Sequence, residues 1–268
     1  MITRKSPAEL ELMRAANGLV ASVLAAMRRL VAPGVSTLDL DAVAERMVRE
    51  AGAVPAFKGY HGYPATLCAS VNDAVVHGIP SASPLTQGDI VSLDMGVVLE
   101  GFYGDSAITV PVGTVPDRTM ELLRVTSESL ALAIEQMRVG GHVSDIGHAV
   151  QRHVEANGFA VVREFVGHGI GATLHEEPQI PNYGEPGRGP VLAPGMVFAI
   201  EPMVTMGAAA VKVLSDRWTA VTRDGSLAAH FEHTVAVTDA GPLVLSQMTE
   251  RDAAPAPLAP EPASVLQG

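Results

Sequence analysis

The sequence predicts an α+β fold in which one domain is built from two similar halves. Two helical patterns are followed by a strand-rich stretch, and this order occurs twice along the 268 residues. The two segments with this order also match in sequence, since Glu11–Arg14 corresponds to Glu121–Arg124 at an offset of 110 residues. Such internal similarity indicates an ancient duplication, with halves at about 1–113 and 114–248.

The first half opens with two helices. Ser6–Glu9 has the form of a capping box with proline at the first helical position, and it predicts a helix that runs to about Val31. A second N-cap at Ser36 predicts another helix, which ends before Gly52. The chain therefore begins as a helix pair.

Short strands follow this pair, and the same order then returns. Ile90–Leu93 and Ile108–Val110 are β-branched runs bounded by glycine and proline, which is typical of strands. Helical patterns reappear at about Thr119–Arg138 and Ser144–Ala156, and a second strand-rich stretch extends to about Leu245. We expect a single domain over residues 1–250.

Composition restricts the class of protein. With 47% hydrophobic residues, 18% charged residues and a net charge of −11, the chain should fold and should not bind nucleic acid through a broad basic surface. A single cysteine, Cys68, excludes an intramolecular disulfide and favours the cytoplasm. The apolar stretches Ala15–Met27 and Gly189–Ile200 are shorter than the roughly 20 residues of a membrane span. Residues 251–268, rich in proline and alanine, are predicted to be a disordered tail.

Four acidic residues stand beside predicted strands at related places in the two halves. Asp94 and Glu201 follow apolar runs and lie 107 residues apart, whereas Asp105 and Glu232 precede such runs. Any one of them alone is best explained as a strand-end carboxylate on a solvated face. Four of them in a chain with only 18 Lys and Arg favour a cation site, because a buried carboxylate needs a partner.

His168 is a candidate nitrogen ligand. It lies within Gly167–Gly171, where glycines on both sides allow another group to approach the backbone closely. A lone histidine of this kind is usually only hydrogen-bonded. The run also fits a Gly-x-Gly-x-x-Ala dinucleotide pattern, but that pattern must open a helix, and Pro178 and Pro181 follow soon after. We therefore favour a ligand in the cation site.

Several motifs in combination resemble the methionine aminopeptidases of type I. The resemblance covers about residues 4–245. It is carried by Val76–Pro80, Leu93-Asp94 with Gly104–Ser106, Gly167–Gly171 with His175–Pro178, Ile200–Met203 and Phe231–Thr234. It implies the pita-bread fold, whose two pseudo-symmetric halves form a curved antiparallel sheet covered by two helix pairs. It also implies a hydrolase that removes the N-terminal methionine from nascent proteins when the second residue is small.

The resemblance further implies a centre of two divalent metal ions. Its ligands would be Asp94, Asp105, His168, Glu201 and Glu232, with Asp105 and Glu232 bridging both ions. Two ions about 3.5–4 Å apart share a water, lower its pKa so that it attacks as hydroxide, and stabilise the oxyanion. Co, Mn, Fe or Zn would suit these ligands. His168 and Glu201 would complete one ion and Asp94 would bind the other, while Glu201 would also carry a proton.

Other residues receive roles in substrate binding by the same resemblance. His77 and His175 would contact the substrate, with His175 donating a hydrogen bond to the scissile carbonyl; otherwise they are best explained as solvated loop histidines. A pocket for the methionine side chain would be lined by Tyr60, Tyr63, Cys68, Leu174, Phe198 and Trp218. His61, the counterpart of His168 in the first half, is expected only to line the cleft.

Other functions remain open at this point. Prolidase and aminopeptidase P share the fold and the ligands but usually carry an extra N-terminal domain, whereas the first helix here begins near residue 6. Glu201 and Glu232 are 31 positions apart, which is too close for the insertion of type II methionine aminopeptidases. A metal-free binding module is disfavoured by five intact ligand positions. We expect a monomer that acts on nascent N termini, contacts the ribosome exit region only through its folded surface, and binds no membrane.

Overall fold

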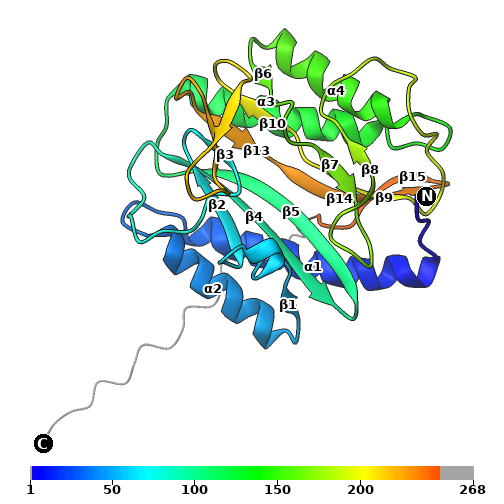
Figure 1. Ribbon diagram of the computed structural model, residues 1–268, viewed down its shortest axis with the longest axis horizontal. Helices are drawn as coiled ribbons and strands as arrows, with labels where there is room; N and C mark the ends of the chain where they lie inside the picture. Colours follow the sequence, from blue (N-terminus) through cyan, green and yellow to red (C-terminus); the bar gives the residue numbers. More distant parts are fainter. Residues whose placement is uncertain (1, 248–268) are drawn as a thin grey trace, which may run out of the picture.

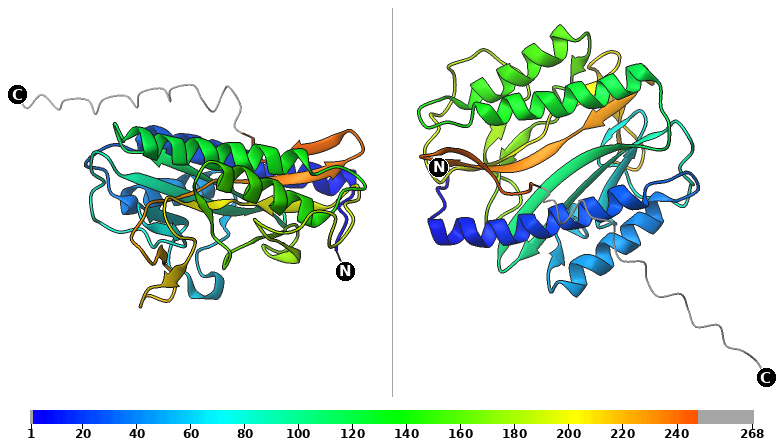
Figure 2. Two further views of the ribbon diagram at one scale, coloured as in Figure 1. Left: turned by 90° about the horizontal axis from the view of Figure 1, so that it is seen from above. Right: turned by 180° about the vertical axis from the view of Figure 1, so that it is seen from behind.

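Four helices and a nine-stranded antiparallel sheet make up most of the computed structural model, which describes residues 2–247 (Figure 1). The helices are α1 (Pro7–Leu30), α2 (Thr37–Glu50), α3 (Asp117–Glu135) and α4 (Val143–Ala156). Figure 2 shows that both helix pairs lie on the same face of the sheet. All four predicted helices are confirmed, because they agree with these bounds to within about one turn.

The predicted capping box of α1 is confirmed. The Oγ atom of Ser6 accepts from the backbone N–H of Glu9 at 3.3 Å, and the Glu9 carboxylate accepts from the backbone N–H of Ser6 at 2.7 Å. Ser36 and Asp39 form the same pair of bonds at the start of α2, at 3.1 and 3.2 Å. These bonds satisfy backbone donors that a helix N-terminus leaves free, so they fix where both helices begin.

The central sheet has the strand order β1-β4-β5-β14-β9-β7-β8, with β2 paired to β4 and β15 paired to β14. Its strands are β1 (Val54–Pro55), β2 (Leu67–Val71), β4 (Ile90–Leu99), β5 (Phe102–Pro111), β7 (Gly167–Gly169), β8 (Glu176–Ile180), β9 (Val197–Ile200), β14 (Glu232–Thr238) and β15 (Gly241–Val244). At the centre, Glu232 of β14 lies opposite Ala107 of β5. One half of the chain therefore supplies each side of the sheet.

Two three-stranded sheets, β13-β10-β6 and β11-β12-β3, and a short 3₁₀ helix complete the fold. Their elements are β3 (Ala74–Val76), β6 (Ala160–Val161), β10 (Met203–Thr205), β11 (Val211–Val213), β12 (Ala220–Thr222), β13 (Ala228–His230) and η1 (Tyr60–Gly62). The β11–β12 hairpin projects from the side opposite to the helices (Figure 2). The α+β class is confirmed. The boundary drawn near residue 113 stays a prediction, and the tail at 251–268 lies outside the described residues.

The apolar character of α1 is explained by its contact with the sheet. Val20 and Leu24 pack in one core cluster with Leu93 of β4 and Ile108 of β5. Within residues 2–247, α1 is also the one helix long and apolar enough to span a membrane, and half of that window is buried inside the structure. Its hydrophobic residues are therefore used to form the core.

Candidate metal centre

Strand alternation places the acidic side chains on the face of the sheet away from the helices. In β4, Leu93 and Met95 pack in the cluster under α1, so Asp94 between them faces the other side. The same period of two places Asp105 of β5 and Glu232 of β14 on that face, because Ile108 of β5 and Val235 of β14, each three residues further along, lie in the helix-side core. Residues distant in the sequence are thus brought together by strand pairing.

A cavity of ≈ 300 Å³ opens on this face. Of the predicted site residues, its walls include Tyr60, Tyr63, Cys68, His77, Asp94, Asp105, His168, Leu174, His175, Glu201, Trp218 and Glu232. Phe198 is not among them, and its prediction as a pocket residue was wrong. It points to the helix side of β9 and is fully buried in the core cluster with Leu122, because its position in the strand differs by an odd number from that of Glu201.

Three ligand atoms of the site lie close together. One donor atom each from Asp105, His168 and Glu232 falls within 4.8 Å of the others. The Nε2 atom of His168 is 3.6 Å from Oε1 of Glu201 and 3.9 Å from Oδ2 of Asp105. Asp94 joins from the neighbouring strand, since it lies opposite Ala107 in the β4–β5 ladder.

The backbone of this cluster is held by hydrogen bonds, but the carboxylates are not. Asp105 donates its backbone N–H to the side-chain oxygen of Asn17 at 3.2 Å, and its carbonyl accepts from the Thr234 hydroxyl at 2.8 Å. By contrast, Asp94 Oδ1, Asp105 Oδ1 and Glu232 Oε1 are buried without a hydrogen-bond partner among the described residues. Buried oxygens of this kind are costly unless a cation satisfies them.

The carboxyl groups shift each other's pKa in the same direction. Burial raises the pKa of Asp94 to about 7. Burial and the charge of Asp94 raise the pKa of Glu201 and, with further carboxylates, the pKa values of Asp105 and Glu232, all well above their usual range. Within residues 2–247, the nitrogen groups that come within 4.0 Å of these carboxylates are the imidazoles of His168 and His230, and no lysine or arginine pairs with them. Four carboxylates with one imidazole therefore fit a divalent metal ion.

His168 is presented to this cluster by the glycines beside it. A Cβ atom at Gly167 would collide with the carbonyl oxygen of Ala199, and one at Gly169 with that of Glu177, so β7 can lie between its neighbours only with glycine there. The Nδ1 atom of His168 lies 2.9 Å from the carbonyl oxygen of Gly169, which leaves Nε2 toward the carboxylates. Burial, aided by His175, lowers the pKa of His168 to about 4, so the ring is neutral, as metal binding requires.

Two further histidines form the rim of the cavity. The ring of His175 lies 4.3 Å from that of His168, and its Nδ1 atom is 2.8 Å from the hydroxyl of Tyr60. His77 has a left-handed backbone with φ of 58° and sets its ring edge to face against Phe165 at 5.4 Å. Burial, with a smaller effect of His175, lowers the pKa of His77 to about 4. Both rings are therefore in reach of a molecule in the cavity.

Some cavity residues were not predicted from the sequence. They are Val76, Glu164, Phe165, Val166 and His230. His230 is buried, and its Nε2 atom, 3.9 Å from Oε2 of Glu201, has no hydrogen-bond partner in the part of the chain that the structure describes. Its spacing of two residues from Glu232 was the available signal, because such residues share a face of the sheet. His61 is exposed and does not line this cavity, but its ring contacts that of Tyr60 at 4.4 Å.

Comparison with known proteins agrees with this geometry. Residues 11–239 match the family described as metallopeptidase family M24. The chain is 50% identical to methionine aminopeptidase 1 of Bacillus subtilis over 248 residues, which cover 92% of this chain and all of the relative. Methionine aminopeptidase 1 of Mycobacterium tuberculosis is 51% identical, with 92% and 95% covered. The crystal structure of methionine aminopeptidase from Thermotoga maritima aligns with a TM-score of 0.91 and 47% identity, with 92% and 100% covered.

The chain therefore belongs to metallopeptidase family M24. Membership in this family implies a divalent metal ion, and the donor set described above fits one. Within the family the chain is a methionine aminopeptidase of type I, which confirms the family, the pita-bread fold and the enzyme class predicted from its motifs. The prolidase-like and metal-free alternatives are accordingly not favoured.

Proposed function

We propose that the chain removes the N-terminal methionine of nascent polypeptides whose second residue is small, with two divalent metal ions as cofactors. One observation carries this proposal: three buried carboxylate oxygens, without hydrogen-bond partners within residues 2–247, share a cavity with a neutral imidazole and several aromatic rings. Two ions, rather than one, would give each of these oxygens a partner. Co, Mn, Fe and Zn are all compatible with carboxylate and imidazole ligands.

The five ligands would divide between the two ions. Asp105 and Glu232 lie in the adjacent central strands and would contact both, His168 and Glu201 would contact one, and Asp94 the other. When bound, the ions would supply a water of lowered pKa and positive charge beside the scissile carbonyl. The buried carboxyl groups would have to release protons to bind them, because burial raises their pKa values.

Glu201 and His175 would act directly on the reacting groups. The Glu201 carboxylate would take a proton from the attacking water and deliver it to the leaving amine, a role suited to its raised pKa. If the Tyr60 hydroxyl donates to Nδ1 of His175, at 2.8 Å, the imidazole carries its proton on Nε2. That N–H would then donate to the carbonyl oxygen as it becomes an oxyanion.

The apolar part of the cavity would hold the methionine side chain. Tyr60, Tyr63, Cys68, Leu174 and Trp218 line it. The hydroxyl of Tyr63 is already used, because it donates to the carbonyls of Leu67 and Gly78 at 2.9 and 2.8 Å, so only its ring is offered to a ligand. A thioether packs well in such a slot because it is flexible and polarisable.

The compartment, oligomeric state and ribosome contact of the enzyme are also proposals. We propose a cytoplasmic monomer that meets nascent chains at the ribosome exit region through its folded surface. A single buried cysteine, Cys68, is compatible with a reducing compartment. The net charge of −11 gives no general attraction to RNA, so any ribosome contact would depend on local surface chemistry.

Peptide cleavage tests the proposed specificity. The metal-loaded enzyme should cleave Met-Ala-Ser far faster than Met-Lys-Ser, because the crowded space under His77 and His175 would admit only a small second side chain. Each peptide should be assayed with Co, Mn, Fe and Zn in turn. Equal rates on the two peptides, or a preference for X-Pro peptides, would refute the proposal.

A further inference from the structure

A buried ion pair lies directly beside His175 and has no part in the mechanism described so far. Within residues 2–247, Lys5 is the one lysine that is buried, and its side chain is 5% exposed. Its Nζ atom lies 2.6 Å from Oε2 of Glu176, the residue that follows His175 in the sequence. The hydroxyl of Thr3 donates to the same carboxylate oxygen. The N-terminal segment thus holds the start of β8.

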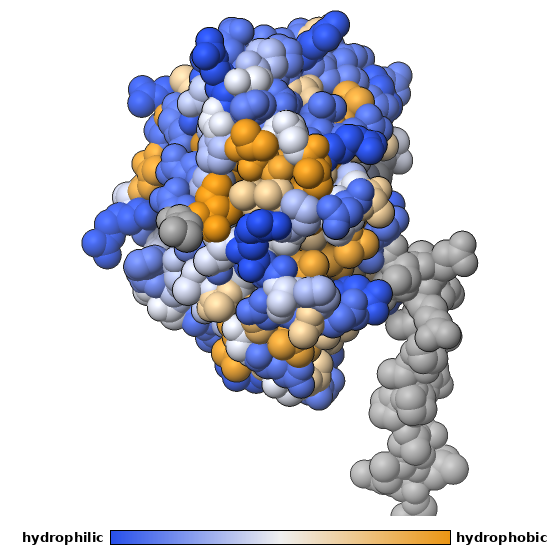
Figure 3. All heavy atoms as spheres, turned by 90° about the vertical axis from the view of Figure 1, so that its right-hand side faces the viewer, coloured by the Kyte–Doolittle hydropathy of each residue, from blue (hydrophilic) through white to orange (hydrophobic). Residues whose placement is uncertain are grey.

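The segment that carries Lys5 is itself fixed. The backbone N–H of Lys5 donates to the carbonyl of Gly195 at 2.7 Å, and the Nε atom of Arg4 donates to the carbonyl of Pro194 at 2.7 Å. Ser6, the next residue, caps α1. Figure 3 shows the face on which the N terminus lies, a mainly hydrophilic surface with separate hydrophobic patches, to which Lys5 contributes very little. Lys5 is therefore a rigid anchor.

The segment that carries His175 is held both within itself and at its two ends: Leu174 is buried, and the Thr173 hydroxyl donates to the carbonyl of His175 at 3.3 Å. Residues 171–175 form a bend between β7 and β8, and His175 is exposed. The bend is tied at its start, where Tyr103 donates its backbone N–H to the carbonyl of Gly171 at 2.9 Å. At its end the Glu176 carboxylate binds Lys5, and both side chains press on Gly171, since a Cβ atom there would collide with them. The ion pair therefore closes the bend.

We propose that the Lys5–Glu176 pair is a positioning device that holds the imidazole of His175 at its place beside His168. The pair acts through the backbone of the bend, and the Tyr60 hydroxyl fixes the ring at its other side. Lys5 and Glu176 are positioning residues and touch no reacting group. An ion pair suits this task because removing one partner leaves the other charge buried and unpaired. The bend would then have to move far enough to expose that charge to water. The inference rests on the proposed function of His175.

Kinetics of Lys5→Met, His175→Ala and the double variant test the inference. Lys5→Met keeps the apolar stem and removes the ammonium group. We expect kcat on Met-Ala-Ser to fall about 10- to 100-fold, with KM within about twofold and metal content unchanged, because small misplacement of a catalytic group is costly. In the His175→Ala background, Lys5→Met should change kcat less than about twofold, since the group it positions is gone.

A matched control and a second variant keep the test decisive. Arg124 of α3 forms an ion pair of similar length, 2.7 Å, with Glu128, at 53% and 42% exposure and on the opposite face of the sheet from the cavity, so Arg124→Met should leave kcat unchanged. If Lys5→Met does not fold, the nearly isosteric Glu176→Gln replaces it as the test variant. This variant should lower kcat by a similar factor. In the metal-free protein, ¹⁵N-histidine NMR should show the His175 ring signals shifted by Lys5→Met and not by Arg124→Met.

The outcomes separate this inference from the proposed function. If His175→Ala keeps full kcat, the role of His175 itself fails and the inference fails with it. If His175→Ala is slow but Lys5→Met and Glu176→Gln retain kcat, the pair is only structural and the inference alone is overturned. An equal loss from Lys5→Met with and without His175 would also overturn it.

Discussion

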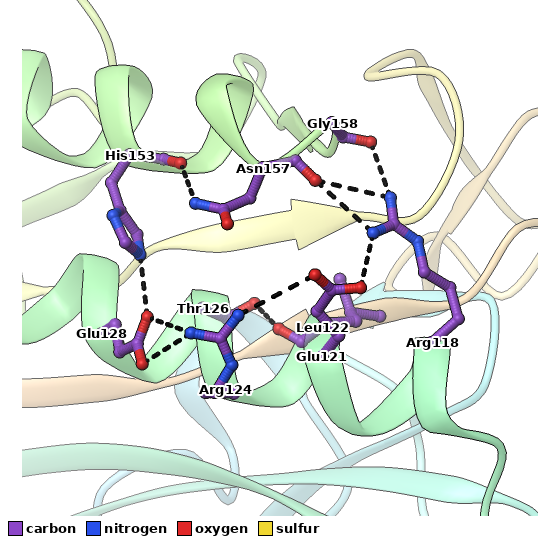
Figure 4. Close-up of polar contacts among 9 residues, drawn as sticks. All are labelled: Arg118, Glu121, Leu122, Arg124, Thr126, Glu128, His153, Asn157 and Gly158. Atoms are coloured by element: carbon purple, nitrogen blue, oxygen red, sulfur yellow. Dashed lines mark hydrogen bonds and ion pairs between the residues drawn. The ribbon is translucent and has the colours of Figure 1, made fainter.

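Two clusters of charged side chains in this protein differ in whether the acidic groups meet a partner within the chain. Between α3 and α4, each acidic side chain meets a basic one: Arg118 lies 2.7 Å from Glu121, and Arg124 lies 2.7 Å from Glu128 (Figure 4). His153 of α4 lies 3.1 Å from the same Glu128 carboxylate. On the opposite face of the sheet, three buried carboxylate oxygens have no partner among the described residues.

The difference distinguishes a structural cluster from a binding site. Exposed pairs such as Arg124–Glu128 are satisfied within the chain, and each contributes only about 0–1 kcal/mol to stability. The buried carboxylates are held in place by their backbones and gain nothing from each other. Protonation at low pH or a bound cation would relieve this, so at neutral pH metal binding would offset the cost of burying them.

Removing the charge of Glu201 should give the largest effect. Glu201→Gln keeps the size of the side chain but removes its ability to accept a proton. We expect kcat to fall by about 10²–10⁴-fold while the fold persists. Steady-state kinetics with metal analysis of the same sample measure this. An unchanged kcat at full metal content would remove Glu201 from the mechanism.

Two histidines 4.3 Å apart should respond differently to replacement by alanine. His175→Ala should lower kcat by about 10²–10³-fold and leave metal stoichiometry intact, because only a donor to the oxyanion is lost. His168→Ala should weaken metal binding itself, because the site loses its imidazole ligand. Metal titrations of both variants side by side decide the point, and the opposite pattern would reverse the two assignments.

The two clusters should also give opposite pH dependence of stability in the metal-free protein. Burial raises the pKa of Asp94 to about 7 in the folded chain, so its contribution to stability is present below about pH 4 and is lost as the pH rises toward 7. At the surface, hydrogen bonds and charges of Arg124 and His153 lower the pKa of Glu128, so its contribution is lost as the pH falls instead. Asp94→Asn should flatten the fall of stability between pH 4 and 7, measured by chemical denaturation. A slope equal to that of the unchanged protein would contradict this account of Asp94.

The exposed cluster should give the smallest effect. Arg124→Met removes an ion pair whose side chains are 53% and 42% exposed, so the free energy of unfolding should change by less than about 1 kcal/mol. Activity should not change. Urea denaturation and the Met-Ala-Ser assay test both statements, and a loss of activity would show that the α3–α4 surface matters to the site.

The sequence allowed the helices and the family to be predicted because their signals are local. Ser6 and Ser36 mark helix starts through hydrogen bonds made within one turn. Phe198 was misplaced because the resemblance assigned it to the pocket, although its odd spacing from Glu201 places it on the other face of the sheet. For His230 the sequence offered only a weak signal, its spacing of two residues from Glu232, since its approach to Glu201 depends on the pairing of β13 with β10.

The ion pair at Lys5 lies beyond any local pattern. Lys5 and Glu176 are 171 residues apart, and nothing in the sequence around either residue indicates the other. Their meeting depends on how the N-terminal segment crosses Gly195 before α1 begins. Contacts of this kind require the folded chain.

Calorimetric titration of the metal-stripped protein with Mn or Co tests the central claim most directly. The carboxylates at Asp94, Asp105, Glu201 and Glu232 should take up two divalent ions per chain and release protons as they do, since burial raises their pKa values in the metal-free state. Repeating the titration in buffers of different ionisation enthalpy reveals those protons. Two ions bound with proton release is the predicted result, and an absence of binding, or binding without proton release, would contradict the account.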